Sequence, residues 1–196
     1  VVLFSLSLHE ASHGWMASKL GDKTALYTGR LTLDPRKHLD PIGTVCMLLF
    51  GFGWARPVPV NIANFRNRRW GMALTALAGP VSNFITAFIA YCLYFVVRIN
   101  MTNTFLWSLS QFLLIVASMS VGLGVFNLVP VHPLDGSRVL EYFLPARAVD
   151  WIEEHEQVIY VVFMVVILFT PILDRPLSVA SSWMYSLLNW LTSLVM

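Results

Sequence analysis

Two long apolar runs constrain the fold of this chain more than any other feature of its sequence. Residues 71–97 and 104–129 each exceed the roughly 20 apolar residues that a helix needs to cross a bilayer. Charged residues make up only 12% of the 196 residues, against about 25% in soluble domains. We therefore expect an α-helical, polytopic membrane protein. A net charge of +2 is too small to recruit a polyanion, so nucleic acid is not an expected partner.

Four shorter apolar segments surround these runs, at residues 1–20, 41–53, 158–173 and 177–196. The second of them contains three glycines and is too short for a full span, which favours a re-entrant segment. Two neighbouring stretches, 28–33 and 55–61, show alternating patterns and predict a small β-hairpin or strand region. The re-entrant segment and the β region both fall between the first and second full core spans.

Basic residues predict which side of the membrane each loop occupies. Nine of the thirteen Lys and Arg residues lie between Lys19 and Trp70, and loops rich in these residues remain in the cytoplasm. The run 71–97 then leads outward and the run 104–129 returns. Residues 134–156 are accordingly expected on the cytoplasmic side.

The first apolar segment carries an H-E-x-x-H motif from His9 to His13. Residues four apart lie on one face of a helix, so both imidazoles can reach one Zn²⁺, and Glu10 can act on metal-bound water. Such five-residue matches also occur by chance in proteins without a metal. Two histidines and a glutamate in a membrane helix are costly unless they pair or bind something, and this cost favours a metal site.

A catalytic zinc site usually takes three protein ligands, so a third must come from elsewhere in the chain. Asp135 is favoured because it follows the second long run on a proline-bounded, extended backbone and precedes Gly136, which permits a turn. The predicted sidedness brings it to the same membrane face as His9 if segment 41–53 is re-entrant. Other candidates stay open: Asp34, His38, Asp40, His132, Glu141, Glu153, Glu154, His155 and Glu156. Of these, His38 and His155 lie in polar loops and are expected to face solvent.

Two motifs together resemble the site-2 protease family of intramembrane zinc metalloproteases, peptidase family M50. They are the H-E-x-x-H of the first helix and N-x-x-P-x-x-x-L-D-G at residues 127–136. Further stretches at residues 29–35, 40–44, 53–61 and 78–83 look like family landmarks in the family's order. The resemblance covers residues 8–138 and leaves no room for an inserted PDZ or appended CBS module, so we expect a minimal member.

The resemblance implies a three-helix catalytic core in which His9, His13 and Asp135 hold Zn²⁺ and Glu10 is the general base. It also implies that the strand at 55–61 pairs with an unwound substrate segment. Its prolines block one edge, so the N–H and C=O groups of Val58 and Val60 face the other edge, which we expect to be open. The expected substrate-binding residues are Ala55, Arg56, Val58, Val60, Asn83 and Asn127. His132 stands where the family commonly has proline, and it either touches the metal or substrate or lies at the surface.

The expected function is zinc-dependent intramembrane proteolysis, in which a peptide bond within or next to a transmembrane segment of a membrane-protein substrate is hydrolysed. We expect an integral, multi-pass protein of a prokaryotic cell membrane, surrounded by the lipid bilayer, with its active site towards the cytoplasm. Residues 1–137 would form the metalloprotease core and residues 138–196 a cytoplasmic linker with additional C-terminal membrane helices. Two alternatives are a metal or ion transporter, which the scarcity of polar residues in the long runs disfavours, and a non-catalytic membrane-protein binder, which the intact Glu10 disfavours.

Overall fold

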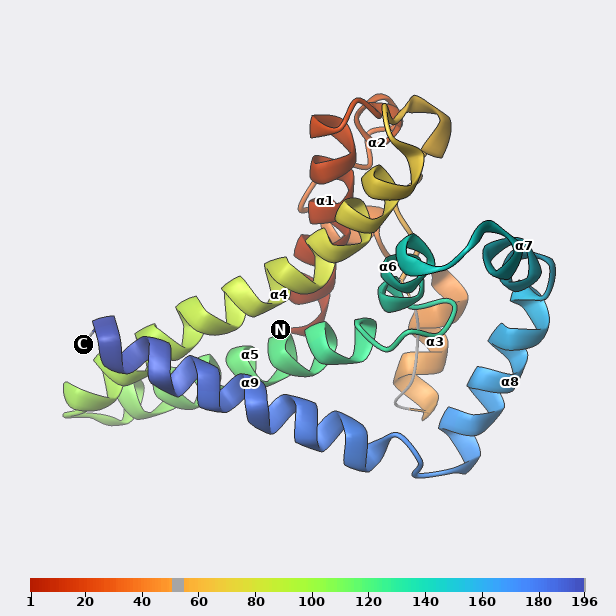
Figure 1. Ribbon diagram of the computed structural model, residues 1–196. Helices are drawn as coiled ribbons and strands as arrows, with labels where there is room; N and C mark the ends of the chain where they lie inside the picture. Colours follow the sequence, from red (N-terminus) through yellow and green to blue (C-terminus); the bar gives the residue numbers. More distant parts are fainter. Residues whose placement is uncertain (51–54, 196) are drawn as a thin grey trace.

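The computed structural model describes residues 1–50 and 55–195, and these residues form helices joined by short loops (Figure 1). The elements in chain order are α1 (Val2–Lys19), α2 (Thr24–Tyr27), η1 (Pro35–Lys37), α3 (Pro41–Phe50), η2 (Ile62–Asn64), α4 (Arg68–Ile99), α5 (Thr104–Asn127), α6 (Asp135–Phe143), α7 (Ala146–Glu154), α8 (Glu156–Phe169) and α9 (Asp174–Val195). The two long apolar runs of the sequence correspond to α4 and α5.

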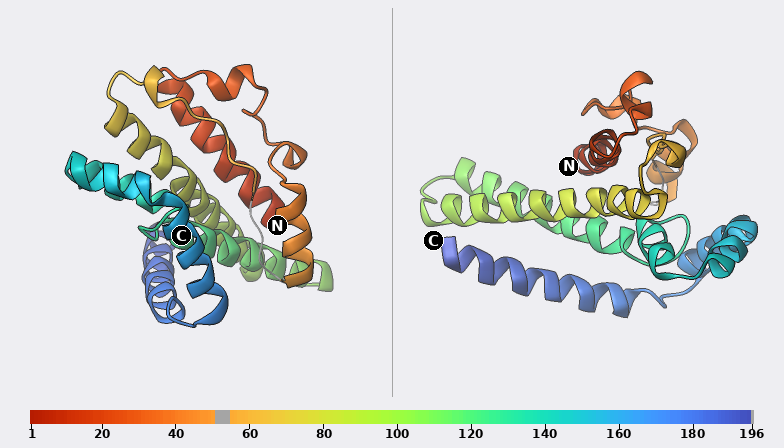
Figure 2. Two further views of the ribbon diagram at one scale, coloured as in Figure 1. Left: turned by 90° about the vertical axis from the view of Figure 1, so that its right-hand side faces the viewer. Right: turned by 45° about the horizontal axis from the view of Figure 1, so that its top comes forward.

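Among the described residues, α4 and α5 are long and apolar enough to cross a membrane. Each begins at an asparagine cap: the side chain of Asn67 accepts the N–H of Trp70 at 3.1 Å, and that of Asn103 accepts the N–H of Leu106 at 2.9 Å. The two helices lie side by side as a long hairpin (Figures 1 and 2). They form the frame on which the rest of the molecule packs.

The C-terminal helices α8 and α9 meet at an 86° bend, as a broken span or a re-entrant pair does. From this bend α9 turns back along the hairpin (Figure 1). Its Leu188 is buried with Ala87 and Val121 in one apolar cluster. The described residues thus contain two candidate spans, or three if the bent pair counts as one. The expectation of a helical membrane protein is confirmed.

Helix α1 packs against α4 and, near its beginning, against α5 (Figure 2). The hydroxyl oxygens of Ser5 and Ser120 lie 3.2 Å apart at the contact with α5. The buried face of α1 is polar, with Ser5, Ser7, His9, Glu10 and His13 at most 9% exposed. Buried polar groups need partners, and the partners of these side chains define the site described below.

The predicted β-hairpin is wrong for the described residues, which contain one isolated antiparallel bridge, between Leu39 and Ala55, and no strand. Residues 28–33 begin with a turn after α2, in which the N–H groups of Arg30 and Leu31 both donate to the carbonyl of Ala25. Gly29 adopts a φ of 67° there, which side chains disfavour. In so short a stretch, alternating residue types indicate which side chains face inward. They do not show that the stretch pairs with another strand.

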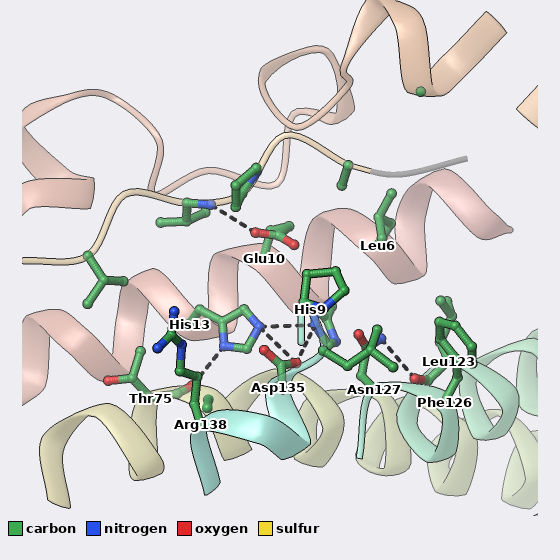
Figure 3. Close-up of a pocket in the computed structure, with 18 of the residues that line it drawn as sticks. Leu6, His9, Glu10, His13, Thr75, Leu123, Phe126, Asn127, Asp135 and Arg138 are labelled. Atoms are coloured by element: carbon green, nitrogen blue, oxygen red, sulfur yellow. Dashed lines mark hydrogen bonds and ion pairs between the residues drawn. The ribbon is translucent and has the colours of Figure 1, made fainter. Parts of the chain in front are cut away.

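The predicted re-entrant segment is helical over α3, which is too short to cross a bilayer because ten residues of helix extend about 15 Å. Gly51 to Trp54, which complete this segment and begin the landmark at 53–61, lie outside the described residues. After them, residues 55–61 run as a single extended segment past α1 (Figure 3). We call residues 55–61 the extended segment.

Candidate metal centre and active site

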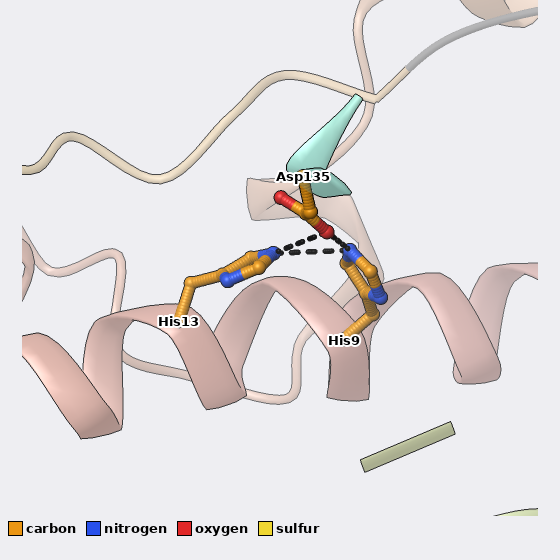
Figure 4. A group of neighbouring side chains, drawn as sticks. All are labelled: His9, His13 and Asp135. Carbon is orange, nitrogen blue, oxygen red and sulfur yellow. Dashed lines mark hydrogen bonds and ion pairs between the residues drawn. The ribbon is translucent and has the colours of Figure 1, made fainter. Parts of the chain in front are cut away.

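Helix α1 directs both histidines of the H-E-x-x-H motif towards a common point (Figure 4). His9 and His13 are one helical turn apart, and their Nε2 atoms are separated by 3.0 Å. Both residues are buried, with 4% and 8% of their surface exposed. Little of either histidine is therefore exposed to bulk water.

Asp135 reaches the same point from the beginning of α6, directly after the loop that follows α5 (Figure 4). Its Oδ2 lies 3.0 Å from Nε2 of His9 and 3.3 Å from Nε2 of His13. The next residue, Gly136, allows the chain to turn sharply, because a Cβ there would overlap the carbonyl oxygen of Leu128. The loop thus returns the carboxylate to α1.

The three ligand atoms fit a zinc ion. They are 3.0–3.3 Å from one another, close to the about 3.3 Å between ligands of a tetrahedral zinc with bonds of about 2.0–2.1 Å. Oδ2 of Asp135 is buried and has no hydrogen-bond partner among the described residues, so it faces the imidazoles without a hydrogen bond. Such an oxygen is costly in a protein interior unless a cation satisfies it. Within residues 1–50 and 55–195, His9, His13 and Asp135 are the group placed to hold an ion.

Helix α4 supports both imidazoles from behind. The carbonyl oxygen of Thr75 lies 2.7 Å from Nδ1 of His13, and the side chain of Asn83 lies 3.0 Å from Nδ1 of His9. Between them, Gly79 leaves room for both rings, since a Cβ there would lie 2.5 Å from His13 and 2.6 Å from His9. Thr75, Gly79 and Asn83 are spaced four apart, as His9 and His13 are. Sequence reasoning overlooked Thr75 and gave Gly79 no role beyond its place in the landmark 78–83, although this matching spacing could have indicated both.

Glu10 leaves α1 towards the extended segment (Figure 3). Its Oε2 accepts a hydrogen bond from the backbone N–H of Val58 at 3.0 Å. The N–H of Arg56, on the same edge of the segment, donates to the carbonyl of His38 at 2.8 Å. The prediction that this edge is open for a substrate is therefore wrong at Val58, where the edge faces inward and its N–H is engaged by Glu10.

Comparisons with known proteins identify the family. The model of peptidase family M50 matches residues 95–171, a stretch that contains Asp135. The chain is 42% identical to "Putative zinc metalloprotease YwhC" of Bacillus subtilis (strain 168) over 167 residues, which cover 84% of this chain and 76% of that protein. This chain belongs to peptidase family M50.

More distant relatives carry a similar description. Two proteins named "Putative zinc metalloprotease Rip2", from Mycolicibacterium smegmatis and Mycobacterium tuberculosis, are 28% and 29% identical over 96% and 98% of this chain. The matches cover 70% and 71% of those proteins. No solved structure gives a significant match. The M50 protein is a membrane zinc metalloprotease, and its cofactor is Zn²⁺.

A pocket of about 600 Å³ opens at the M50 site, a volume that suits a ligand (Figure 3). Glu10 and the three zinc-ligand candidates line it. Of the predicted substrate-binding residues, Ala55, Val58, Val60 and Asn127 also line it. Arg56 is exposed outside the lining, and Asn83 is fully buried behind His9. Asn83 therefore has no surface to offer a substrate, which corrects the expectation drawn from its motif.

The extended segment is held by side chains that sequence reasoning also overlooked. The guanidinium of Arg30 donates to the carbonyls of Arg56 and Pro57 at 2.7 and 3.0 Å. The fully buried carboxylate of Asp22 accepts the N–H of Asn61 at 2.7 Å and the side-chain amide of Asn64 at 2.7 Å. These bonds fix the segment in front of Glu10.

His132 does not join the zinc-ligand group, and the expectation that it lies at the surface is wrong. It is 3% exposed, and its Nε2 lies 2.6 Å from Glu141 and its Nδ1 3.3 Å from Glu156. Arg138 lies 3.2 and 3.4 Å from the same two carboxylates. This network joins the loop that precedes Asp135 to α6 and to the beginning of α8.

The remaining candidates for the third ligand have other partners. Asp34 and Asp40 accept N–H groups two and three residues further along the chain, as turn residues do. His38 is 1% exposed and lies 2.8 Å from the carbonyl of Thr32, so its predicted exposure is wrong. Nδ1 of His155 lies 2.8 Å from the carbonyl of Trp151. Glu153 and Glu154 are exposed on α7.

Proposed function

We propose that this M50 protein is an intramembrane endopeptidase that hydrolyses a peptide bond within or next to a transmembrane segment of another membrane protein. The observation that carries the proposal is the convergence of His9, His13 and Asp135 beside Glu10, against a helix that is long and apolar enough to span. The α4 residues that contact the histidines, Thr75 and Asn83, lie about 10 and 22 Å along the helix from Arg68. This depth supports a reaction inside the membrane rather than beyond the end of α4.

We assign His9, His13 and Asp135 as the zinc ligands and Glu10 as the general base. When held by these residues, zinc would polarise the scissile carbonyl and lower the pKa of a water towards ~7. Glu10 takes the proton of the attacking water through Oε1 and passes it to the leaving amine. The N–H of Val58 holds Oε2, which fixes the carboxylate while leaving Oε1 for proton transfer.

The substrate must be extended at the cut, because a helix hides each carbonyl in its own hydrogen-bond ladder. Ala55, Val58, Val60 and Asn127 line the pocket and form the wall that we assign to the substrate. Since the inward edge of the extended segment binds Glu10, we assign substrate contacts to these side chains and not to strand pairing along that edge. The basic loops favour an active site towards the cytoplasm.

Zinc analysis and product mapping test this proposal together. Glu10→Gln should keep zinc and lose cleavage, whereas His9→Ala, His13→Ala and Asp135→Ala should lose both. In membranes from cells that produce wild type or Glu10→Gln, mass spectrometry should find fragments ending in or next to a transmembrane segment only with wild type. Fragments ending only in soluble domains would contradict the intramembrane reaction. Full zinc occupancy in Asp135→Ala would contradict the ligand set.

A further inference from the structure

The amide of Asn83 lies behind the metal centre and has no part in the reaction proposed above. It is fully buried, and one of its two polar atoms, Nδ2, lies 3.0 Å from Nδ1 of His9. The other atom, Oδ1, has no hydrogen-bond partner among the described residues. Among the described residues, the hydrogen-bond contact of this buried amide is therefore with His9 alone.

The neighbouring histidine shows what zinc binding requires. Nδ1 of His13 lies 2.7 Å from the carbonyl oxygen of Thr75. A carbonyl only accepts, so Nδ1 of His13 carries the proton and Nε2 presents its lone pair to the metal point. The backbone of α4 therefore selects the ligating tautomer of His13.

His9 needs the same tautomer to ligate through Nε2, but the atom that faces its Nδ1 is a donor. With Nδ2 of Asn83 donating to Nδ1, the proton of a neutral His9 sits on Nε2, which then cannot bind a metal. Rotation of the amide by 180° brings Oδ1 to Nδ1. Amide nitrogen and oxygen are assigned from their hydrogen-bond network, so a His9 that is protonated at Nδ1 assigns Oδ1 to the position that faces it.

We propose that Asn83 is the positioning residue for His9: in the zinc-loaded protein its side-chain oxygen accepts the Nδ1–H of His9 and so selects the tautomer that ligates. Asn83 and Thr75 then serve the two histidines in the same way, one through a side chain and one through the backbone. The proposal rests on the zinc ligands assigned above. The expected contact between Asn83 and a substrate is thus replaced by a contact between Asn83 and the zinc ligand His9.

Two substitutions at Asn83 separate positioning from packing. Asn83→Asp keeps an acceptor oxygen and resembles the carboxylate–histidine–zinc arrangement, whereas Asn83→Leu has a similar volume and no acceptor. Zinc affinity, measured by competition with a chelator, should fall about 10- to 100-fold in Asn83→Leu and stay near wild type in Asn83→Asp. Thermal stability of the metal-free protein should follow the opposite order, because the aspartate variant would bury a charge and the leucine variant would not.

A zinc affinity in Asn83→Leu equal to that of wild type would overturn the proposal. So would affinities that follow the stability order. If a variant does not fold, ¹⁵N-histidine NMR of the zinc-loaded wild-type protein gives an independent answer, because Nδ1 of His9 should carry a proton and a metal-bound Nδ1 refutes the assignment. His9→Ala provides the reference. If both His9→Ala and Asn83→Leu keep zinc, the ligand set itself is wrong. If His9→Ala loses zinc and Asn83→Leu keeps it, only the role of Asn83 fails.

Discussion

At the scale of single residues, Gly79 leaves the space that both zinc-binding imidazoles occupy. A methyl group there would lie 2.5 Å from His13 and 2.6 Å from His9, closer than van der Waals contact permits. We expect Gly79→Ala to displace both rings and to lower the zinc content of the purified protein at least about tenfold. Gly122→Ala is the matched control, because a Cβ at this exposed helical glycine meets nothing within 4 Å. Equal zinc contents in the two variants would show that the rings do not need this space.

Val58 acts on the active site through one group, its backbone N–H. Its N–H holds Glu10 at 3.0 Å, and hydrogen bonds to charged groups contribute about 1.5–3 kcal/mol. Val58→Pro removes that donor from a segment that is already extended, so cleavage should fall about tenfold or more while zinc content stays unchanged. Val58→Ala keeps the N–H and should be clearly less impaired. If both variants cleave equally well, the hydrogen bond to Glu10 does not assist catalysis.

At the scale of elements, Asp22 connects the end of α1 to the extended segment. Burial alone would raise the pKa of the Asp22 carboxyl, but hydrogen bonds from Thr24, Asn64 and the N–H of Asn61 outweigh burial and lower this pKa below its usual range. A carboxyl with a lowered pKa in the folded protein stabilises the fold above its unfolded pKa of about 4. This stabilisation disappears as the pH falls through the lower, folded value.

Unfolding measurements on Asp22→Asn test this connection. Wild type should be more stable than the variant at pH 5 and above, by about 1–3 kcal/mol, and the difference should shrink as the pH falls below about 4. Loss of zinc in acid affects both proteins alike and cancels in the comparison. Asp34→Asn removes an exposed carboxylate of the same charge and should change stability much less. A stability difference for Asp22→Asn that does not vary with pH would mean that its charge is not what holds the segment.

At the scale of the whole molecule, the features that can be predicted from the sequence are the membrane spans, which the bilayer determines, and the metal-site candidates, which the helix period indicates. Hydropathy identifies α4 and α5, because a membrane span must satisfy its own backbone and be apolar throughout. Helical spacing and a proline-bounded loop identify His9, His13 and Asp135 as candidates. The bond from Val58 to Glu10 and the place of Asn83 behind His9 escape such reasoning, because both depend on how helices and loops approach one another. The prediction of a β-hairpin is wrong for a related reason, because an alternating sequence pattern does not show that a partner strand lies beside it.

The orientation of the protein in the membrane is a prediction that rests on the distribution of its basic residues. Nine of thirteen lie between Lys19 and Trp70, whereas the α4–α5 loop has only Arg98 beside it. Lys37 and Thr102 are exposed in these two regions, so each is suited to a single-cysteine label after Cys46 and Cys92 are changed to Ser. An impermeant maleimide should modify Thr102→Cys in intact cells and Lys37→Cys only after lysis. The reverse pattern would place the Arg68 end of α4 on the outer side. It would contradict an active site towards the cytoplasm and leave the chemistry of the zinc site unchanged.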